Sequence, residues 1–168
     1  MSNRTHEFEQ AALGHVASLL RVARRLTSHS AAEDLVQDCL LLAWRNFHQF
    51  EPGTNARAWL FRILFNTFYG QRRRSQRAPK VIPITAHLRT EAMPVDRALQ
   101  VSEALDSLPI DHRTVLMLAV VEGFTCAEIA AILSIPIGTV MSRLSRARQA
   151  MRSRISTAAV PEGRARKN

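Results

Sequence analysis

Apolar residues recur every three or four positions through most of the chain, which is the spacing of one face of an α-helix. The first such stripe runs from Phe8 to Leu26, and a second extends to about Phe50. Ser30 and Glu33 have the spacing of a capping box, so we expect the second helix to open there. The sequence therefore predicts two amphipathic helices before residue 50.

A third helix is predicted from Ala56 to about Arg74. The preceding turn, EPGTN, offers Thr54 or Asn55 as its N-cap. Three prolines then interrupt the pattern between residues 75 and 94, which is typical of a linker. The first part of the chain is thus expected to be a helical domain over residues 1–74.

The second half predicts four more helices. One spans about 95–107, a second starts near Pro109 and ends at Gly123, and a short third helix opens at the capping box of Thr125 and Glu128. A turn at 134–136 leads into a longer helix whose apolar stripe is Val140, Leu144, Ala147 and Met151. A short helix, a tight turn and a longer helix form a helix-turn-helix. We therefore predict an all-α protein of two small helical domains, 1–74 and 95–168, on a flexible linker (75–94), the C-terminal domain being a helix-turn-helix.

The charged residues on the surface of the last predicted helix are all positive over its first part. The stretch PIGTVMSRLSRARQAMR contains arginines and no acid. With the apolar stripe inward, helical geometry turns Gly138, Ser142, Ser145, Arg146 and Gln149 outward, flanked by Thr139, Met141 and Arg143. Small residues allow close approach to DNA, and arginine contacts bases or phosphates. The alternative interpretation is a solvated basic helix without a partner.

Charge supports a polyanionic partner for the whole chain. The 168 residues include 23 Lys or Arg against 14 Asp or Glu, a net charge of +9 with a pI near 11.3. Positive charge gathers from Arg72 to Lys80 and again from Arg143 onward. This pattern favours nucleic acid or an anionic membrane surface as the partner.

Several function classes lack a sequence signal. The N-terminus has no signal-peptide pattern, and no run of 18 apolar residues predicts a membrane span. Cys39 and Cys126 lie apart in helical patterns, so we expect small buried residues of a reduced protein. No nucleophile–base pair, metal cluster or phosphate loop is evident. We expect no enzyme activity, cofactor, metal, small-molecule substrate or direct membrane insertion.

Two segments together resemble the extracytoplasmic-function (ECF) sigma factors of bacterial RNA polymerase. AEDLVQDCLLLAWRNF, followed by NARAWLFRILFNTFYGQRRR, is similar to their region two. LDSLPIDHRTVLMLAVVEGFTCAEIAAILSIPIGTVMSRLSRAR is similar to region four. The resemblance covers about two-thirds of the chain, with both segments in the family's order.

The resemblance assigns roles in region two. It implies that Asp34, Gln37 and Asp38 dock on the polymerase β′ clamp. It further implies that one helix opens and reads the minus-ten element through Trp59, Phe61, Arg62, Asn66 and Tyr69, with Arg72, Arg73 and Arg74 on phosphates. The turn from His48 to Asn55 should wall a pocket for a flipped base.

In region four the resemblance implies contact with the minus-thirty-five element. The residues are Thr139, Met141, Ser142, Arg143, Ser145, Arg146 and Gln149. Two positions depart from the family pattern: Ser134 replaces a usual glycine, and Met141 replaces a common basic residue. We expect Met141 to read DNA partly by apolar contact, for example to a thymine methyl.

The implied partners are core RNA polymerase (β′ clamp and β flap), promoter DNA and an anti-sigma factor, in the cytoplasm. An inhibitor is expected to occlude both lobes in a compact arrangement that the linker permits. Two alternatives remain open at this point. One is a stand-alone helix-turn-helix transcriptional regulator, and the other is a membrane-surface protein with basic amphipathic helices.

Overall fold

The computed structural model describes residues 3–77 and 95–158, and within these ranges every regular element is helical. This confirms the expected all-α class. The helices are α1 (Asn3–Ala12), α2 (Val16–Leu26), α3 (His29–Arg45), α4 (Ala56–Arg77), α5 (Val95–Asp106), α6 (Ile110–Leu116), α7 (Cys126–Leu133) and α8 (Ile137–Ala158). The expected linker began at Ser75, but α4 continues through Arg77, and the rest of that linker lies outside the described residues.

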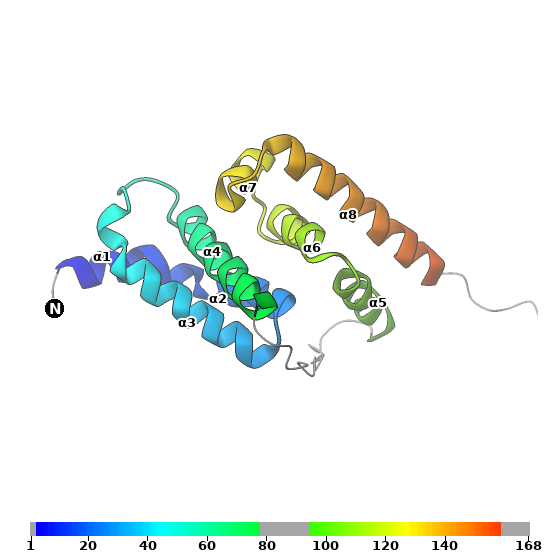
Figure 1. Ribbon diagram of the computed structural model, residues 1–168, viewed down its shortest axis with the longest axis horizontal. Coiled ribbons are helices and arrows are strands. Elements are labelled where there is room, and N and C mark those ends of the chain that lie inside the picture. The colour runs from blue at the N-terminus through cyan, green and yellow to red at the C-terminus, as the bar shows by residue number, and fades with distance from the viewer. Residues whose placement is uncertain (1–2, 78–94, 159–168) are drawn as a thin grey trace, which may run out of the picture.

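The helices form two lobes, a first lobe of α1–α4 and a second lobe of α5–α8 (Figure 1). Helices α4 and α7 pack against each other at the centre, and α8 lies along the outer edge of the second lobe (Figure 1). The buried apolar residues of both lobes belong to one continuous cluster. The two lobes therefore share a packed boundary, which we call the seam.

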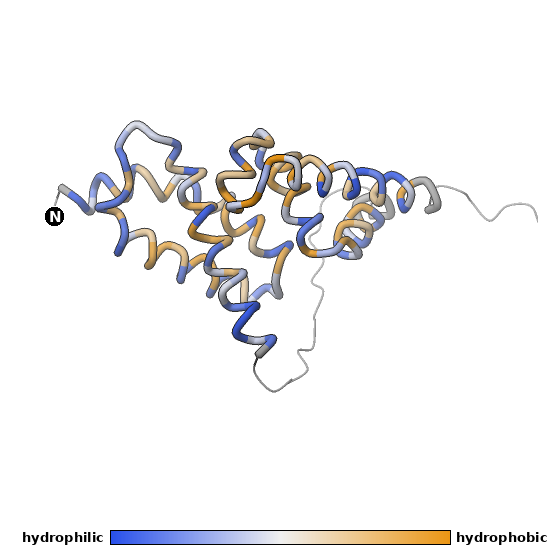
Figure 2. Tube along the Cα trace, turned by 45° about the horizontal axis from the view of Figure 1, so that its top comes forward, coloured by the Kyte–Doolittle hydropathy of each residue, from blue (hydrophilic) through white to orange (hydrophobic). Residues whose placement is uncertain are grey.

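The apolar stripes supply the core of each lobe. Leu19, Leu35, Leu60 and Leu64 are fully buried where α2, α3 and α4 meet. Burying one such side chain contributes about 1.5–3 kcal/mol. Figure 2 shows hydrophobic positions turned toward neighbouring helices, whereas the end of α4 nearest the grey trace is hydrophilic. The first lobe thus presents a polar, basic helix end beyond its core.

The first predicted helix is divided in two. A 3₁₀ turn, Leu13–His15, separates α1 from α2, and it contains Gly14, a residue that weakens a helix interior. Before this turn, in α1, the Phe8 ring packs edge-on against Trp44 at 5.2 Å and Phe47 at 5.3 Å between centroids. The break therefore allows α1 to close over the end of α3.

The capping box expected at Ser30 and Glu33 is wrong. Helix α3 begins at His29 with Ser28 as its N-cap, so Ser30 already lies in the first turn. The Glu33 carboxylate lies 3.4 Å from His29 and 3.6 Å from Arg24, both exposed pairs. An acid three residues after a serine satisfied the pattern, but its side chain lies beside Arg24 and His29 instead.

Helix α3 also ends earlier than expected, at Arg45. The Asn46 side chain donates to the Leu42 carbonyl at 2.8 Å, and a 3₁₀ turn, Phe47–Gln49, follows. After it, the Asn55 side chain accepts from the Ala58 amide at 3.0 Å, which confirms Asn55 as a cap of α4. The irregular segment between α3 and α4 is therefore fixed at both ends.

Candidate nucleic-acid and polymerase interfaces

The helix-turn-helix begins at a capping box, as predicted. The Thr125 hydroxyl accepts from the Glu128 amide at 3.2 Å, and the Glu128 carboxylate accepts from the Thr125 amide at 2.8 Å. The hydrogen bonds that the Glu128 carboxylate accepts from the Thr125 amide, the Thr125 hydroxyl and Asn55 lower the pKa of Glu128. Both partners thus satisfy amides that α7 would leave free at its first turn.

The turn between α7 and α8 needs a left-handed residue. Ser134 is the C-cap of α7 with φ 54° and ψ 45°. A side chain with a Cβ is strained in this region, whereas glycine is not. This backbone conformation explains why a glycine would suit the position better than Ser134.

Helix α8 packs as the sequence predicted. Val140, Leu144 and Ala147 are buried, and Met151 packs against the same cluster half-buried. Its opposite face is open. The exposed members of the predicted minus-thirty-five set are Met141, Ser142, Ser145, Arg146 and Gln149, whereas Thr139 is half-buried.

The Arg143 side chain points away from that exposed face, toward α6. Its guanidinium forms an ion pair with Asp111 of α6 at 2.8 Å and is half-buried. A cation held by a carboxylate in its own lobe has less charge to offer a phosphate. The structure therefore separates Arg146, which is free toward solvent, from Arg143, which braces α8 on α6.

Helix α3 exposes the predicted polar set on one face. Asp34, Gln37 and Asp38 are exposed, and Asp38 accepts a hydrogen bond from Gln71 of α4 at 3.0 Å. Leu41, 55% exposed, lies one turn further along the same face. Sequence reasoning overlooked Leu41 because it reads as one more apolar residue of a core stripe.

Helix α4 has one face open and one face covered. Arg62 and Asn66 are exposed, as are Arg72, Arg73 and Arg74 near its end. These positions are compatible with the predicted contacts to DNA.

Phe61 and Tyr69 of the predicted minus-ten set lie on the covered face instead. Phe61 is fully buried and meets Phe124 of the second lobe edge-on at 5.4 Å. The Tyr69 hydroxyl donates to Asp111 at 3.2 Å, and burial is the main cause that raises the pKa of this phenol. In this arrangement both side chains contact the second lobe, so their contact with DNA stays a prediction.

Trp59 lies between the core and the turn that precedes α4. Its ring is half-buried, 5.1 Å from Phe50 and 6.3 Å from Phe47, and the two phenylalanine rings stack at 5.6 Å. An aromatic group of this kind is rigid and presents flat apolar surface. Trp59 therefore supports the turn and does not project to solvent as a free reader would.

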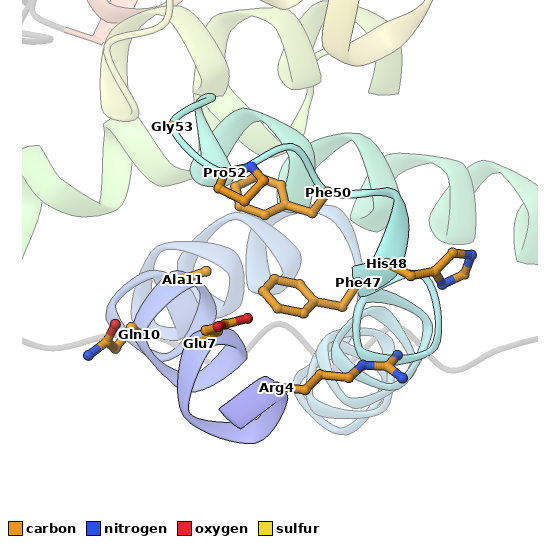
Figure 3. Close-up of a pocket in the computed structure, with 9 residues that line it drawn as sticks. All are labelled: Arg4, Glu7, Gln10, Ala11, Phe47, His48, Phe50, Pro52 and Gly53. Atoms are coloured by element: carbon orange, nitrogen blue, oxygen red, sulfur yellow. The ribbon is translucent and has the colours of Figure 1, made fainter. Parts of the chain in front are cut away.

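A pocket of about 660 Å³ lies between α1 and this turn. Figure 3 shows Phe47, Phe50 and Pro52 on one side and Glu7 and other α1 residues opposite, with the His48 ring pointing outward. The sequence predicted the wall formed by the turn. The lining residues outside the predicted turn are Phe47 and, from α1, Arg4, Glu7, Gln10 and Ala11.

The two cysteines lie in packed surroundings. Cys39 is fully buried, and its thiol lies 3.5 Å from the Leu60 carbonyl. Burial raises the pKa of the Cys39 thiol to about 12, so it stays protonated at neutral pH. Cys126 is half-buried at the start of α7.

Over the described ranges, no single helix is long and apolar enough to span a membrane. Helices α7 and α8 meet that test only as a pair, and they are bent by 110° to each other.

Comparison with known proteins identifies both lobes. Residues 13–78 match the family Sigma-70 region 2, and residues 98–151 match Sigma-70, region 4. The chain is 38% identical to the ECF RNA polymerase sigma factor EcfG of Rhodopseudomonas palustris, over 81% of this chain and 78% of that protein. It is also 38% identical to the ECF sigma factor SigL of Mycobacterium tuberculosis, over 82% of each.

A solved structure shows the same architecture. The sigma factor RpoE of Bartonella quintana, crystallised with the anti-sigma factor NepR, is similar with a TM-score of 0.75 and 35% identity. The similarity covers 89% of this chain and 97% of that one. Two sigma-70 regions in order, and relatives matched over most of their length, lead to one conclusion: this chain belongs to the ECF sigma factors, which direct bacterial RNA polymerase to promoters.

Proposed function

We propose that the three exposed surfaces divide the work of a sigma factor among them. The α3 face binds core polymerase, α4 with the adjoining turn reads the minus-ten element, and α8 reads the minus-thirty-five element. The observation that carries this proposal is the uncovered face of α8, where Arg146 and its small neighbours stand opposite the packed apolar stripe. A helix with that division fits the major groove and leaves its core intact.

On α3, the proposed polymerase contact joins charge to an apolar anchor. Asp34 and Gln37 are polar and exposed, and Leu41 adds apolar surface on the same face. Interfaces commonly surround an apolar centre with polar groups. This supports the β′ clamp as the partner of α3. The β flap, the other proposed polymerase partner, is assigned to the second lobe as a whole.

For the minus-ten element, we propose that one base leaves the stack and enters the pocket beside α1. The stacked rings of Phe47 and Phe50 offer apolar walls, and Gln10 of α1 offers both a donor and an acceptor. Asn66 lies on the open face of α4, where its amide can meet an unpaired base edge. Arg72 and its two neighbours then hold phosphates further along the helix.

On this proposal the protein works by binding and not by catalysis, in the cytoplasm with polymerase and DNA. The NepR complex of the Bartonella relative supports an anti-sigma factor as a further partner. Such an inhibitor would cover surfaces that meet polymerase. The proposed minus-ten and minus-thirty-five sites would then be engaged only after its release.

Run-off transcription with purified core polymerase tests the proposal. The chain should direct specific initiation on templates that carry both elements, and should lose it when either element is scrambled. A stand-alone helix-turn-helix regulator would bind the upstream element without forming a holoenzyme. Co-elution with core polymerase on size exclusion separates these two outcomes, with the polymerase alone as the control.

A further inference from the structure

The seam contains a fully buried carboxylate. Glu122, which follows the π-helical turn after α6, has no exposed side-chain surface and lies between two cations of the first lobe. Arg21 of α2 approaches Glu122 Oε1 at 3.1 Å, and Arg57 of α4 pairs with Oε2. Arg57 also donates to the Glu122 backbone carbonyl at 2.6 Å. Since an unpaired buried charge is strongly unfavourable, Glu122 depends on cations from the other lobe.

The backbone directs Glu122 into the seam. A π-helical turn, Met117–Val121, ends α6, and the Glu122 amide donates to Met117 at 3.1 Å. Gly123 follows with φ 70°, in the left-handed region that suits glycine. Such wide turns are rare in helices and frequently occur at functional sites.

Further contacts near Glu122 join the two lobes through an aromatic ring and through hydrogen bonds. The Arg57 guanidinium lies 4.5 Å from the centroid of Phe124, and Phe124 in turn meets Phe61. Arg25 donates to Ser102 at 2.7 Å, and Arg113 donates to the Arg25 carbonyl at 2.9 Å. In the ion-pair cluster, the first lobe supplies the cations and the second lobe supplies the acid.

In this packed form the two lobes cannot contact the minus-ten and minus-thirty-five elements at the same time. Elements centred about 25 base pairs apart are separated by about 85 Å of B-DNA at ~3.4 Å per pair. A compact chain of this length has a radius of gyration of about 15 Å. Between Arg77 and Val95 lie 17 residues, 78–94. Fully extended, they would reach at most about 60 Å. This connecting segment is therefore long enough for the lobes to separate substantially. They must separate for both to reach their promoter elements.

We propose that the ion pairs of Glu122 with Arg21 and Arg57 stabilise a closed, autoinhibited form of the free protein. No second protein is needed to hold this form. Opening removes the contacts of Phe61 and Tyr69 with the second lobe and frees the lobes to take the spacing that polymerase and promoter require. The inference rests on the proposed function for its consequence, but the closed form itself can be tested without polymerase.

Two substitutions test the cluster from opposite lobes. Glu122→Gln keeps the side-chain shape and removes the charge, and Arg57→Gln removes a cation from the first lobe. Glu103→Gln is the matched control, because Glu103 is an exposed acid of the same lobe. Circular dichroism at 222 nm is measured first, so that each variant is known to be folded.

Small-angle X-ray scattering of the isolated full chain then measures the radius of gyration. We expect it to rise by at least a fifth in Glu122→Gln and Arg57→Gln and to stay unchanged in Glu103→Gln. Tyr69 gives a second readout, because it is the sole tyrosine. Burial raises its pKa, so an ultraviolet titration of the tyrosinate should shift to lower pH in the two opened variants.

Stopped-flow association with core polymerase tests autoinhibition. We expect at least threefold faster association for the opened variants and an unchanged rate for Glu103→Gln. A folded Glu122→Gln protein and a folded Arg57→Gln protein that both keep the wild-type radius would overturn the closed form. An increased radius with an unchanged association rate would overturn its inhibitory role. Failure of the wild-type chain to bind polymerase would instead contradict the proposed function and leave the scattering result to decide the closed form.

Discussion

Helices α4 and α8 are both 22 residues long, both are rich in arginine, and both are proposed to read DNA. They differ in what surrounds them. Helix α8 packs one stripe and leaves its opposite face open, whereas α4 is covered on two sides, by its own lobe and across the seam by α7. A duplex reader needs only one open helix face. A reader of melted DNA also needs a pocket and a stacking surface, which α4 obtains from the turn before it.

The largest expected effect concerns neither reading helix but the surface that brings both to the promoter. Replacing Asp34, Gln37 and Asp38 together with alanine should reduce core polymerase binding by at least a hundredfold. All three side chains are exposed, so the melting temperature should change little. Fluorescence anisotropy with labelled core polymerase measures the affinity. Holoenzyme formation at wild-type affinity would remove α3 from the interface.

The next effect tests α8 as the duplex reader. Arg146→Ala should cost about 1–3 kcal/mol in binding to the minus-thirty-five element, since a base contact is lost from the open face. Arg143→Ala is the informative comparison, because Arg143 pairs with Asp111 and should affect stability more than DNA sequence preference. Initiation on templates with altered upstream elements measures both. Equal losses on every template for Arg146→Ala would assign that residue to phosphates.

A smaller and less specific effect is expected at the end of α4. Changing Arg72, Arg73 and Arg74 to glutamine removes three exposed cations. Binding of the holoenzyme to DNA should weaken on all promoters alike. The negative slope of log K against log salt should become shallower by about 2–3. Promoter binding by holoenzyme over a salt series gives that slope. A loss confined to one minus-ten sequence would mean that this stretch reads bases.

The smallest effect concerns the turn that sets α8 on α7. Ser134→Gly should raise the free energy of unfolding by about 1 kcal/mol, because the left-handed conformation of Ser134 is strained for a residue with a Cβ. Chemical denaturation measures this. Ser134→Ala serves as the control and should not stabilise, since it retains the Cβ. Destabilisation by glycine would show that the serine hydroxyl matters more than the backbone strain.

Local rules in the sequence predicted most of the fold. The capping box of Thr125 and Glu128, the inward stripe through Val140 and the exposed acids of α3 depend on neighbours a few residues away, and the structure confirms them. The box at Ser30 was wrong because a matching pattern does not decide which partner Glu33 takes.

Contacts between distant segments were not predictable in the same way. Phe61 was expected on an accessible face because its lobe was considered alone, and its packing against Phe124 of the second lobe has no local signal. The pairing of Glu122 with Arg21 joins residues 101 positions apart, with no local signal. The α1 side of the pocket was missed because its residues read as an ordinary polar helix face.

If α4 reads melted DNA while α8 reads duplex, Asn66 of α4 is the residue whose loss should affect promoter opening. Permanganate footprinting of holoenzyme is done on a natural promoter and on a template with a pre-melted bubble, for wild type and Asn66→Ala. We expect Asn66→Ala to reduce opening of the natural promoter about tenfold or more and to lose minus-ten preference on the bubble, while core binding and upstream contacts stay unchanged. If Asn66→Ala opens the natural promoter as wild type does and keeps its sequence preference, the account is contradicted, and the base reader lies in the turn before Ala56.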